Sequence, residues 1–194
     1  MAEPVRRSPV AGLALAARSV PGPEPVTLAA LPFRGKLIVR GGADAQKRAA
    51  DILGLDLPGP LRGHVRDEMA ALWLGPDEWL VLLASGTEEQ RAEVLRARLA
   101  GCHHAVVVVS DRMCGIAVEG TRAREVLNAG CALDLHDDAF PPGTATRTLL
   151  GKAPIVLWRT ERGGFELWVN GSLAPYAWQF LENAALEYGF AITA

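Results

Sequence analysis

The chain of 194 residues carries 49% hydrophobic residues, 22% charged residues and a formal net charge of −2. This is the composition of an ordinary globular domain, long enough for one sizeable core or for two small lobes that share one. Because basic residues are not in excess, we expect no nucleic-acid partner. No apolar run approaches the ~20 residues that a spanning helix needs, so we also expect no membrane partner.

The cysteines are odd in number and share no CxxC spacing: Cys102, Cys114 and Cys131. A disulfide framework is therefore not expected, and a reducing cytoplasm is the default compartment. Cys114 and Cys131 fall on the apolar pattern of their segments, which predicts buried thiols that behave as small hydrophobic side chains.

Residues 1–26 contain five prolines and are predicted to be an extended, poorly ordered N-terminal arm. Arg6 and Arg7 precede a short apolar stretch over 10–17, which could instead be a weak signal peptide. Arg18 follows that stretch at once, which favours the arm.

A strand, a glycine hinge and an amphipathic helix occur twice, 78 residues apart. Each copy ends in Leu-Asp-Leu, and the hinge glycine precedes its aspartate by 14 residues in both: Gly42 and Asp56, Gly120 and Asp134. We interpret this pattern as an internal duplication. The alternative is that strand–helix units are common and the Leu-Asp-Leu motif recurs by chance.

Each copy continues with a hairpin and a second helix. The first hairpin turns at Gly75–Glu78 and the second at 161–164. Thr87 with Gln90 predicts a capping box for the helix that follows the first hairpin, and Ser172 is the predicted cap of the last helix. The run Val106–Val109 has no alternation and is predicted as a strand buried on both faces that opens the second copy.

The predicted fold class is therefore α+β, with duplicated strand–helix–hairpin–helix lobes and mainly antiparallel sheets. We expect residues 27–189 to form a single domain of two pseudo-symmetric lobes. These lobes would cover residues 27–101 and 102–189, and residues 190–194 would be a tail.

Motifs that carry chemistry are scarce. Gly41-Gly42 lies between a strand and a helix but does not complete GxGxxG, so a tight turn is the expected role. Cys102-His103-His104 lacks a second Cys or His pair at zinc-finger spacing, so a loop at a helix end is expected. We predict no catalytic, cofactor-binding or metal-binding residue on this chain.

The candidates that remain are contacts to a partner. Ser110, Asp111 and Arg112 follow the valine strand directly, where polar residues often meet something bound. The alternative is an Asp-initiated turn with a locally paired arginine. Trp73 and Trp168 lie in the hairpins, and large aromatic residues that the core does not use favour a protein interface. Burial in the core is the alternative for each of them.

An ordered series of short segments resembles the gamma subunits of heterotetrameric sarcosine oxidases. The resemblance runs from roughly Leu28 to Tyr188. The segments are Leu74–Leu80, Val109–Arg112, Val118–Leu127, Cys131–His136, Phe140-Pro141 and Arg147–Gly151.

The resemblance implies a fold similar to the folate-binding region of the glycine-cleavage aminomethyltransferase. It also implies a complex that oxidatively demethylates sarcosine to glycine, with hydrogen peroxide and 5,10-methylenetetrahydrofolate as products. In such a complex FAD, FMN, NAD, tetrahydrofolate and zinc belong to partner subunits, and the gamma subunit has no known catalytic residue.

We therefore expect a non-catalytic, cytoplasmic subunit that stabilises the assembly with the alpha, beta and delta subunits by docking on alpha. It would belong to an oxidoreductase complex without catalytic residues of its own. The alternative is a stand-alone folate-binding or one-carbon transfer protein, for which Asp111, Glu119 and Asp134 offer carboxylates that nothing in the sequence distinguishes.

Overall fold

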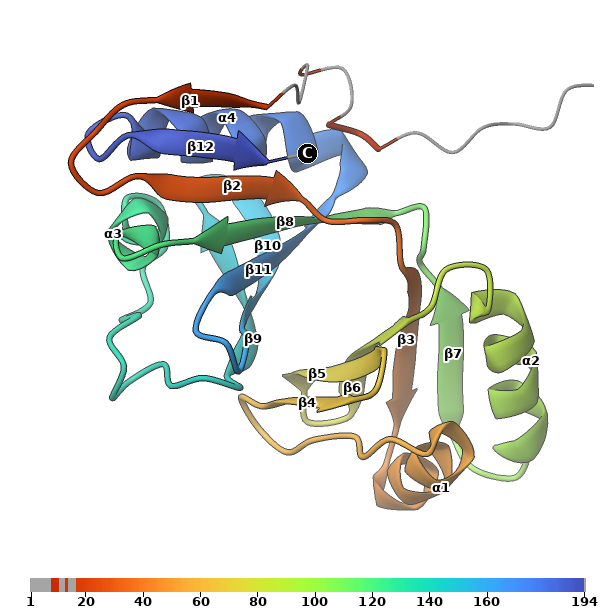
Figure 1. Ribbon diagram of the computed structural model, residues 1–194. Coiled ribbons are helices and arrows are strands. Elements are labelled where there is room, and N and C mark those ends of the chain that lie inside the picture. The colour runs from red at the N-terminus through yellow and green to blue at the C-terminus, as the bar shows by residue number, and fades with distance from the viewer. Residues whose placement is uncertain (1–7, 11–12, 14–16, 194) are drawn as a thin grey trace, which may run out of the picture.

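Two β-sheets pack face to face in the computed structural model, which describes residues 8–10, 13 and 17–193 (Figure 1). The order of the seven-stranded sheet, sheet A, is β1 (Arg18–Val20), β12 (Phe190–Thr193), β2 (Val26–Ala30), β8 (Met113–Glu119), β11 (Phe165–Asn170), β10 (Ala153–Arg159) and β9 (Ala145–Leu150). The order of the five-stranded sheet, sheet B, is β4 (Gly63–Arg66), β5 (Met69–Gly75), β6 (Glu78–Leu83), β3 (Gly35–Gly41) and β7 (His104–Val108). Neighbouring strands are antiparallel except for the parallel pair β12 and β2.

The helices cover the outer faces of the two sheets (Figure 1). Helices α1 (Ala43–Leu53) and α2 (Glu88–Arg98) pack on sheet B, and α3 (Ala123–Asn128) and α4 (Ala174–Ala185) pack on sheet A. A 3₁₀ turn, η2 (Gly171–Leu173), leads into α4. The molecule therefore has four layers, in the order helices, sheet, sheet, helices.

Alternation along the strands explains why sheet B is covered on both faces. On β6, Leu80 and Leu82 join the core between the sheets, whereas Val81 and Leu83 join the core under α1 and α2. Because successive side chains of a strand point to opposite faces, a run of apolar residues supplies two cores at once. Three apolar cores result, one under each helical layer and one between the sheets.

The expected α+β class with antiparallel sheets is confirmed, as are the helices and hairpins predicted in both halves. Both halves run strand, helix, three strands, helix, strand, from β3 to β7 and from β8 to β12. Sheet B has the order β4-β5-β6-β3-β7, and sheet A has β9-β10-β11-β8 followed by β12, with β2 inserted between β8 and β12. Within the described residues no helix is long and apolar enough to cross a membrane.

Thr87 is the N-cap residue of α2, as predicted, but its side chain makes no capping hydrogen bond, and Ser172 is not the cap of α4. Thr87 has helical backbone angles (φ −101°, ψ −8°), and its hydroxyl donates to the carbonyl of Ala84 at 2.8 Å rather than capping α2. An N-cap residue normally needs an extended backbone to aim its oxygen at the first-turn amides. The carboxylate of Glu88 instead accepts from the Gly86 N–H at 2.8 Å. Ser172 lies inside the 3₁₀ turn, one residue before the N-cap Leu173.

The valine strand is also corrected. Val106–Val108 lie in β7, which forms an edge of sheet B, and Val109 follows that strand. Val107 is 49% exposed because sheet A does not cover the inner face of sheet B as far as this edge, so the valine run is not buried on both faces. The strand closes the first half rather than opening the second.

The expected boundaries at residues 26 and 190 do not coincide with the edges of sheet A. Strand β1 lies within the expected arm and pairs with β12, which lies within the expected tail, where Phe190 and Ile192 are buried. Strand β2 lies in the first half of the sequence but pairs with β8 and β12 in sheet A. Most of the segment weighed as a signal peptide falls outside the described residues.

Candidate functional site

The segment after β7 is held tightly to both sheets. Ser110 is 1% exposed, and its hydroxyl accepts the N–H of Lys36 at 2.9 Å, which ties the end of β7 to β3. Arg112 is exposed, its Nε donates to Asn170 Oδ1 at 3.2 Å, and its carbonyl accepts the Gly171 N–H at 2.8 Å. Asp111, between them, is exposed. The structure thus buries one of the three expected contact residues and leaves two at the surface.

The two tryptophans expected at a partner interface lie in different cores. Trp168 on β11 is 1% exposed and packs between the sheets, so its side chain is not available at the surface of this chain. Trp73 on β5 is half-buried against the core under α1 and α2, on the opposite face of sheet B. The structure brings Trp168 near Arg112 but places Trp73 elsewhere, because the two opposite faces of sheet B belong to separate cores and Trp73 lies on the outer one.

Arg112 and Trp168 both line a groove between the two sheets, which we call the inter-sheet groove, with a volume of about 270 Å³. Its apolar lining includes Ile38, Val107, Val109, Met113, Val156 and Trp168. Its polar lining includes Glu78, Arg112, Arg147 and Asn170. This is an apolar floor with charged groups around it, the composition of a site that holds an apolar group and orients it by a few polar contacts.

The two arginines of the groove differ in their partners. Arg147 on β9 forms a two-pronged ion pair with Glu78 on β6, with Nη1 to Oε2 at 3.0 Å and Nη2 to Oε1 in close contact. Arg112 contacts the neutral amide of Asn170 and forms no ion pair within the described residues. A carboxylate brought to this groove would therefore meet an unneutralised guanidinium at Arg112, and the Arg147 site is already occupied.

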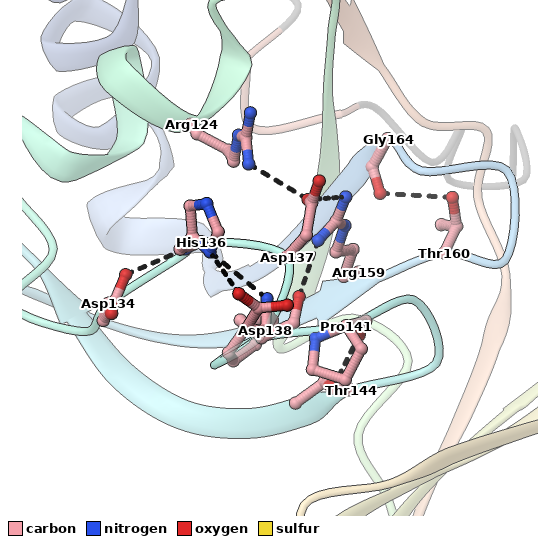
Figure 2. Close-up of polar contacts among 11 residues, drawn as sticks. Arg124, Asp134, His136, Asp137, Asp138, Pro141, Thr144, Arg159, Thr160 and Gly164 are labelled. Atoms are coloured by element: carbon pink, nitrogen blue, oxygen red, sulfur yellow. Dashed lines mark hydrogen bonds and ion pairs between the residues drawn. The ribbon is translucent and has the colours of Figure 1, made fainter.

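A second polar cluster closes the opposite end of the inter-sheet contact (Figure 2). Arg159, at the end of β10, is 8% exposed and reaches two groups on the loop that precedes β9. Its Nη2 pairs with Asp137 at 2.6 Å, and its Nη1 donates to the Phe140 carbonyl at 2.7 Å. Arg124 of α3 also pairs with Asp137, at 3.0 Å. The hydrogen bond from Arg159 holds the pKa of Asp137 below its ordinary value of 3.8.

The same loop links the sheets through the backbone. Thr144 bridges to Arg62, the Gly63 N–H donates to the Gly143 carbonyl at 2.7 Å, and the Ala145 N–H donates to the Leu61 carbonyl at 3.2 Å. The cluster drawn in Figure 2 therefore fixes a structural loop. Asp134, one of the two equivalent aspartates of the repeat, accepts the His136 N–H at 2.9 Å. Sequence reasoning missed Arg159 and Asp137, because nothing local marks two charges 22 residues apart as partners.

A half-buried carboxyl, Glu166, lies close to Trp158 and Arg34. Glu166 on β11 is the register partner of Trp158 on β10, and both line a broad, open cavity of about 500 Å³ with Arg34 and Phe33. Burial raises the pKa of Glu166 above its ordinary value of 4.5, and the nearby Arg34 guanidinium opposes this rise.

Cysteine and histidine chemistry is sparse in the described part of the chain. The cysteines are free, and burial raises the pKa of Cys114, which makes a thiolate there less accessible. His104, the first residue of β7, places its Nδ1 2.9 Å from the carbonyl of Cys102 in the preceding loop. No group of three or more histidine, cysteine or acidic side chains suited to a metal ion occurs among residues 8–10, 13 and 17–193.

Sequence comparison relates nearly the whole chain to one family. The model of the "Sarcosine oxidase, gamma subunit family" matches residues 40–187. The gamma subunit of sarcosine oxidase from Corynebacterium sp. (strain U-96) is 32% identical over 96% of this chain and 93% of that subunit. The gamma subunit from an Arthrobacter species is 34% identical over 95% of this chain and 92% of that protein.

Solved structures agree with this relationship. A chain of the heterotetrameric sarcosine oxidase from Corynebacterium sp. U-96 has a TM-score of 0.84 and 28% identity, covering 94% of this chain and 96% of that one. The glycine cleavage system aminomethyltransferase T from Bartonella henselae has a TM-score of 0.56 and 15% identity, covering 81% of this chain and 45% of that one. The second likeness is one of fold.

Proposed function

The chain belongs to the sarcosine oxidase gamma subunit family, and we propose that it is a non-catalytic subunit that stabilises a heterotetrameric sarcosine oxidase. The observation that carries this proposal is the match of nearly the entire chain, at a TM-score of 0.84, to one chain of a solved heterotetrameric enzyme. Both lengths are almost fully covered, so the whole fold is shared rather than one module of it.

The larger assembly would supply the chemistry. It would oxidatively demethylate sarcosine to glycine, yielding hydrogen peroxide and 5,10-methylenetetrahydrofolate. FAD, FMN, NAD, tetrahydrofolate and zinc would bind to the partner alpha, beta and delta subunits, in the cytoplasm. This chain would dock on the alpha subunit and contribute surface, through Asp111, Arg112 and the half-buried Trp73.

The two halves of the chain resemble each other in the order of their helices and strands. Both halves share the order of elements, and the sheets share strand order apart from the insertion of β2 and the addition of β1 at the edge of sheet A. These observations support an origin by internal duplication, with residues 17–193 as one domain of two lobes. Strand β2 precedes the first half in the sequence but pairs within the sheet of the second half, and it therefore links the two lobes. Such a link suits a subunit with a structural role.

The rival function is folate binding or one-carbon transfer by the chain alone. An aminomethyltransferase from Saccharopolyspora erythraea is 30% identical over 66% of this chain, although the match covers 35% of that enzyme. The three carboxylates considered for such a site are exposed and lie on separate elements: Asp111 after β7, Glu119 at the end of β8 and Asp134 after α3. The full-length match to gamma subunits favours the subunit function over this rival.

Co-purification tests the proposal. The tagged chain is expressed with the neighbouring open reading frames of its source, and the mass and visible absorption of the eluted material are recorded. A yellow complex far heavier than 20.7 kDa, with a colourless chain when isolated, is the expected result. A chain that elutes alone and binds tetrahydrofolate in calorimetry would overturn the proposal and establish the rival.

A further inference from the structure

The core between the sheets is left open at β7. Val109 is 5% exposed and belongs to that core, whereas Val107, two residues earlier on the same face, is 49% exposed. Ile38, the register partner of Val107 on β3, is half-buried and packs against the same core. The inner face of sheet B thus continues past the area that sheet A covers. Val107 lies on this uncovered part and lines the inter-sheet groove.

Part of the backbone edge of β7 carries no hydrogen bond within the residues that the structure describes. The Val109 N–H donates to the Lys36 carbonyl at 2.8 Å, and residues of an antiparallel pair alternate in direction, so the backbone groups of Val106 and Val108 face away from β3. The Val106 carbonyl is covered by Arg96 Nε at 3.0 Å. No hydrogen bond within the described part of the chain uses the outward groups of Val108. An edge with free donors and acceptors is a template for an added strand.

The charged side chains of the inter-sheet groove indicate which kind of partner side chain would fit it. Glu78 neutralises Arg147, but the exposed Arg112 contacts the amide of Asn170 and forms no ion pair among the residues described. A carboxylate can satisfy a guanidinium with two parallel hydrogen bonds, so an acidic side chain complements the groove. The groove, at about 270 Å³, is smaller than the roughly 300–1,000 Å³ of sites that hold cofactor-sized ligands. Its size suits amino-acid side chains.

We infer that an extended segment of a larger subunit of the oxidase adds to the free edge of β7. This segment pairs with the outward groups of Val108, seats an aliphatic side chain on Val107 in the inter-sheet groove and places a carboxylate beside Arg112. Strand addition obtains affinity from main-chain bonds and specificity from pockets for alternate side chains. The inference rests on the proposed function and identifies the surface through which the subunit docks.

Photo-crosslinking in the assembled complex tests this contact directly. A photoreactive phenylalanine analogue replaces Val107 in the chain co-expressed with the other subunits, and the cross-linked peptides are sequenced. We expect one segment of a larger subunit, with alternating apolar residues and an aspartate or glutamate close to the cross-linked position. A cross-link only to a second copy of this chain, or none in an assembled complex, would overturn the inference.

Two substitutions measure how much the groove contributes to assembly with the larger subunits. Val107→Asp and Arg112→Glu should each lower the fraction of the chain that elutes with the flavin-containing complex by about tenfold or more, since a charge is placed in an apolar groove or opposite a like charge. Leu186→Asp and Arg98→Glu are matched controls at exposed positions outside the groove, and they should assemble normally. Circular dichroism checks that each variant is folded.

The outcomes separate this inference from the proposed function. If the wild-type chain does not enter a complex, both fail. If the wild-type chain assembles and both folded groove variants assemble equally well, the subunit function stands and docking through β7 is wrong.

Discussion

The two ends of the contact between the sheets differ: hydrogen bonds and an ion pair close one end, and the other end is an open groove. At the end formed by β4 and β9, backbone bonds join Leu61–Gly63 to Gly143–Ala145, and Arg159 fastens the adjoining loop (Figure 2). At β7 the sheets separate and leave an apolar groove with Arg112, which forms no ion pair with any residue that the structure describes. We therefore expect the closed end to stabilise the fold. The open end instead presents an exposed apolar surface and an arginine that a partner can contact.

Trp158 provides the strongest test of the closed end. It is 5% exposed in the core between the sheets, so Trp158→Ala should lower the free energy of unfolding by about 3–5 kcal/mol. Chemical denaturation of the isolated chain measures this change. Trp73→Ala, at a half-buried tryptophan, is the control and should cost clearly less. Equal losses would mean that the inter-sheet core does not dominate stability.

Gly63 tests how closely β4 approaches sheet A. A Cβ added there would lie 2.8 Å from Trp158 Nε1 and 2.9 Å from Leu72 Cδ2, so Gly63→Ala should destabilise the fold by about 1–3 kcal/mol through overpacking. Gly59→Ala is the matched control, because nothing lies within 4 Å of its added Cβ. Thermal melts of the two variants compare them, and similar melting temperatures would contradict the close approach.

The pH dependence of Glu166 probes the strand next to Trp158. A carboxyl whose pKa is raised on folding binds its proton more tightly in the folded chain, so its contribution to stability falls as pH rises from about 4.5 through the raised value. Glu166→Gln should remove this fall and flatten the stability profile above pH 4.5. Denaturation at several pH values measures it, with the exposed Glu187→Gln as control. An unchanged slope in Glu166→Gln would show that the carboxyl does not titrate abnormally.

Val107 should give the smallest effect on the isolated chain. Because half of its surface faces solvent, Val107→Ala should change the free energy of unfolding by no more than about 0.5 kcal/mol. Denaturation of the chain without partners provides the measurement. A loss of several kcal/mol would show that the groove belongs to the closed core, and the contrast between the two ends would disappear.

Local chemistry made much of the fold predictable. The hairpin at Gly75–Glu78 and the helix stripe of Ala92, Leu95 and Leu99 depend on residues close in sequence, and the structure has them where the pattern indicates. The predicted capping box at Thr87 failed because two alternative local hydrogen bonds, from Thr87 to Ala84 and from Gly86 to Glu88, compete with it. Of the candidate site, the sequence indicated Arg112 but gave no sign of the groove beside it.

By itself, the sequence determined the α+β class, the helices and hairpins of both halves and the resemblance to gamma subunits. The tertiary structure decided that β7 is an edge, that Trp168 is buried and that Arg159 meets Asp137. The physical reason is that periodicity fixes which side of a strand is apolar, whereas its position at the centre or edge of a sheet depends on pairing with distant segments. Val106–Val109 has the composition of a central strand, and only the order of the neighbouring strands leaves Val107 exposed.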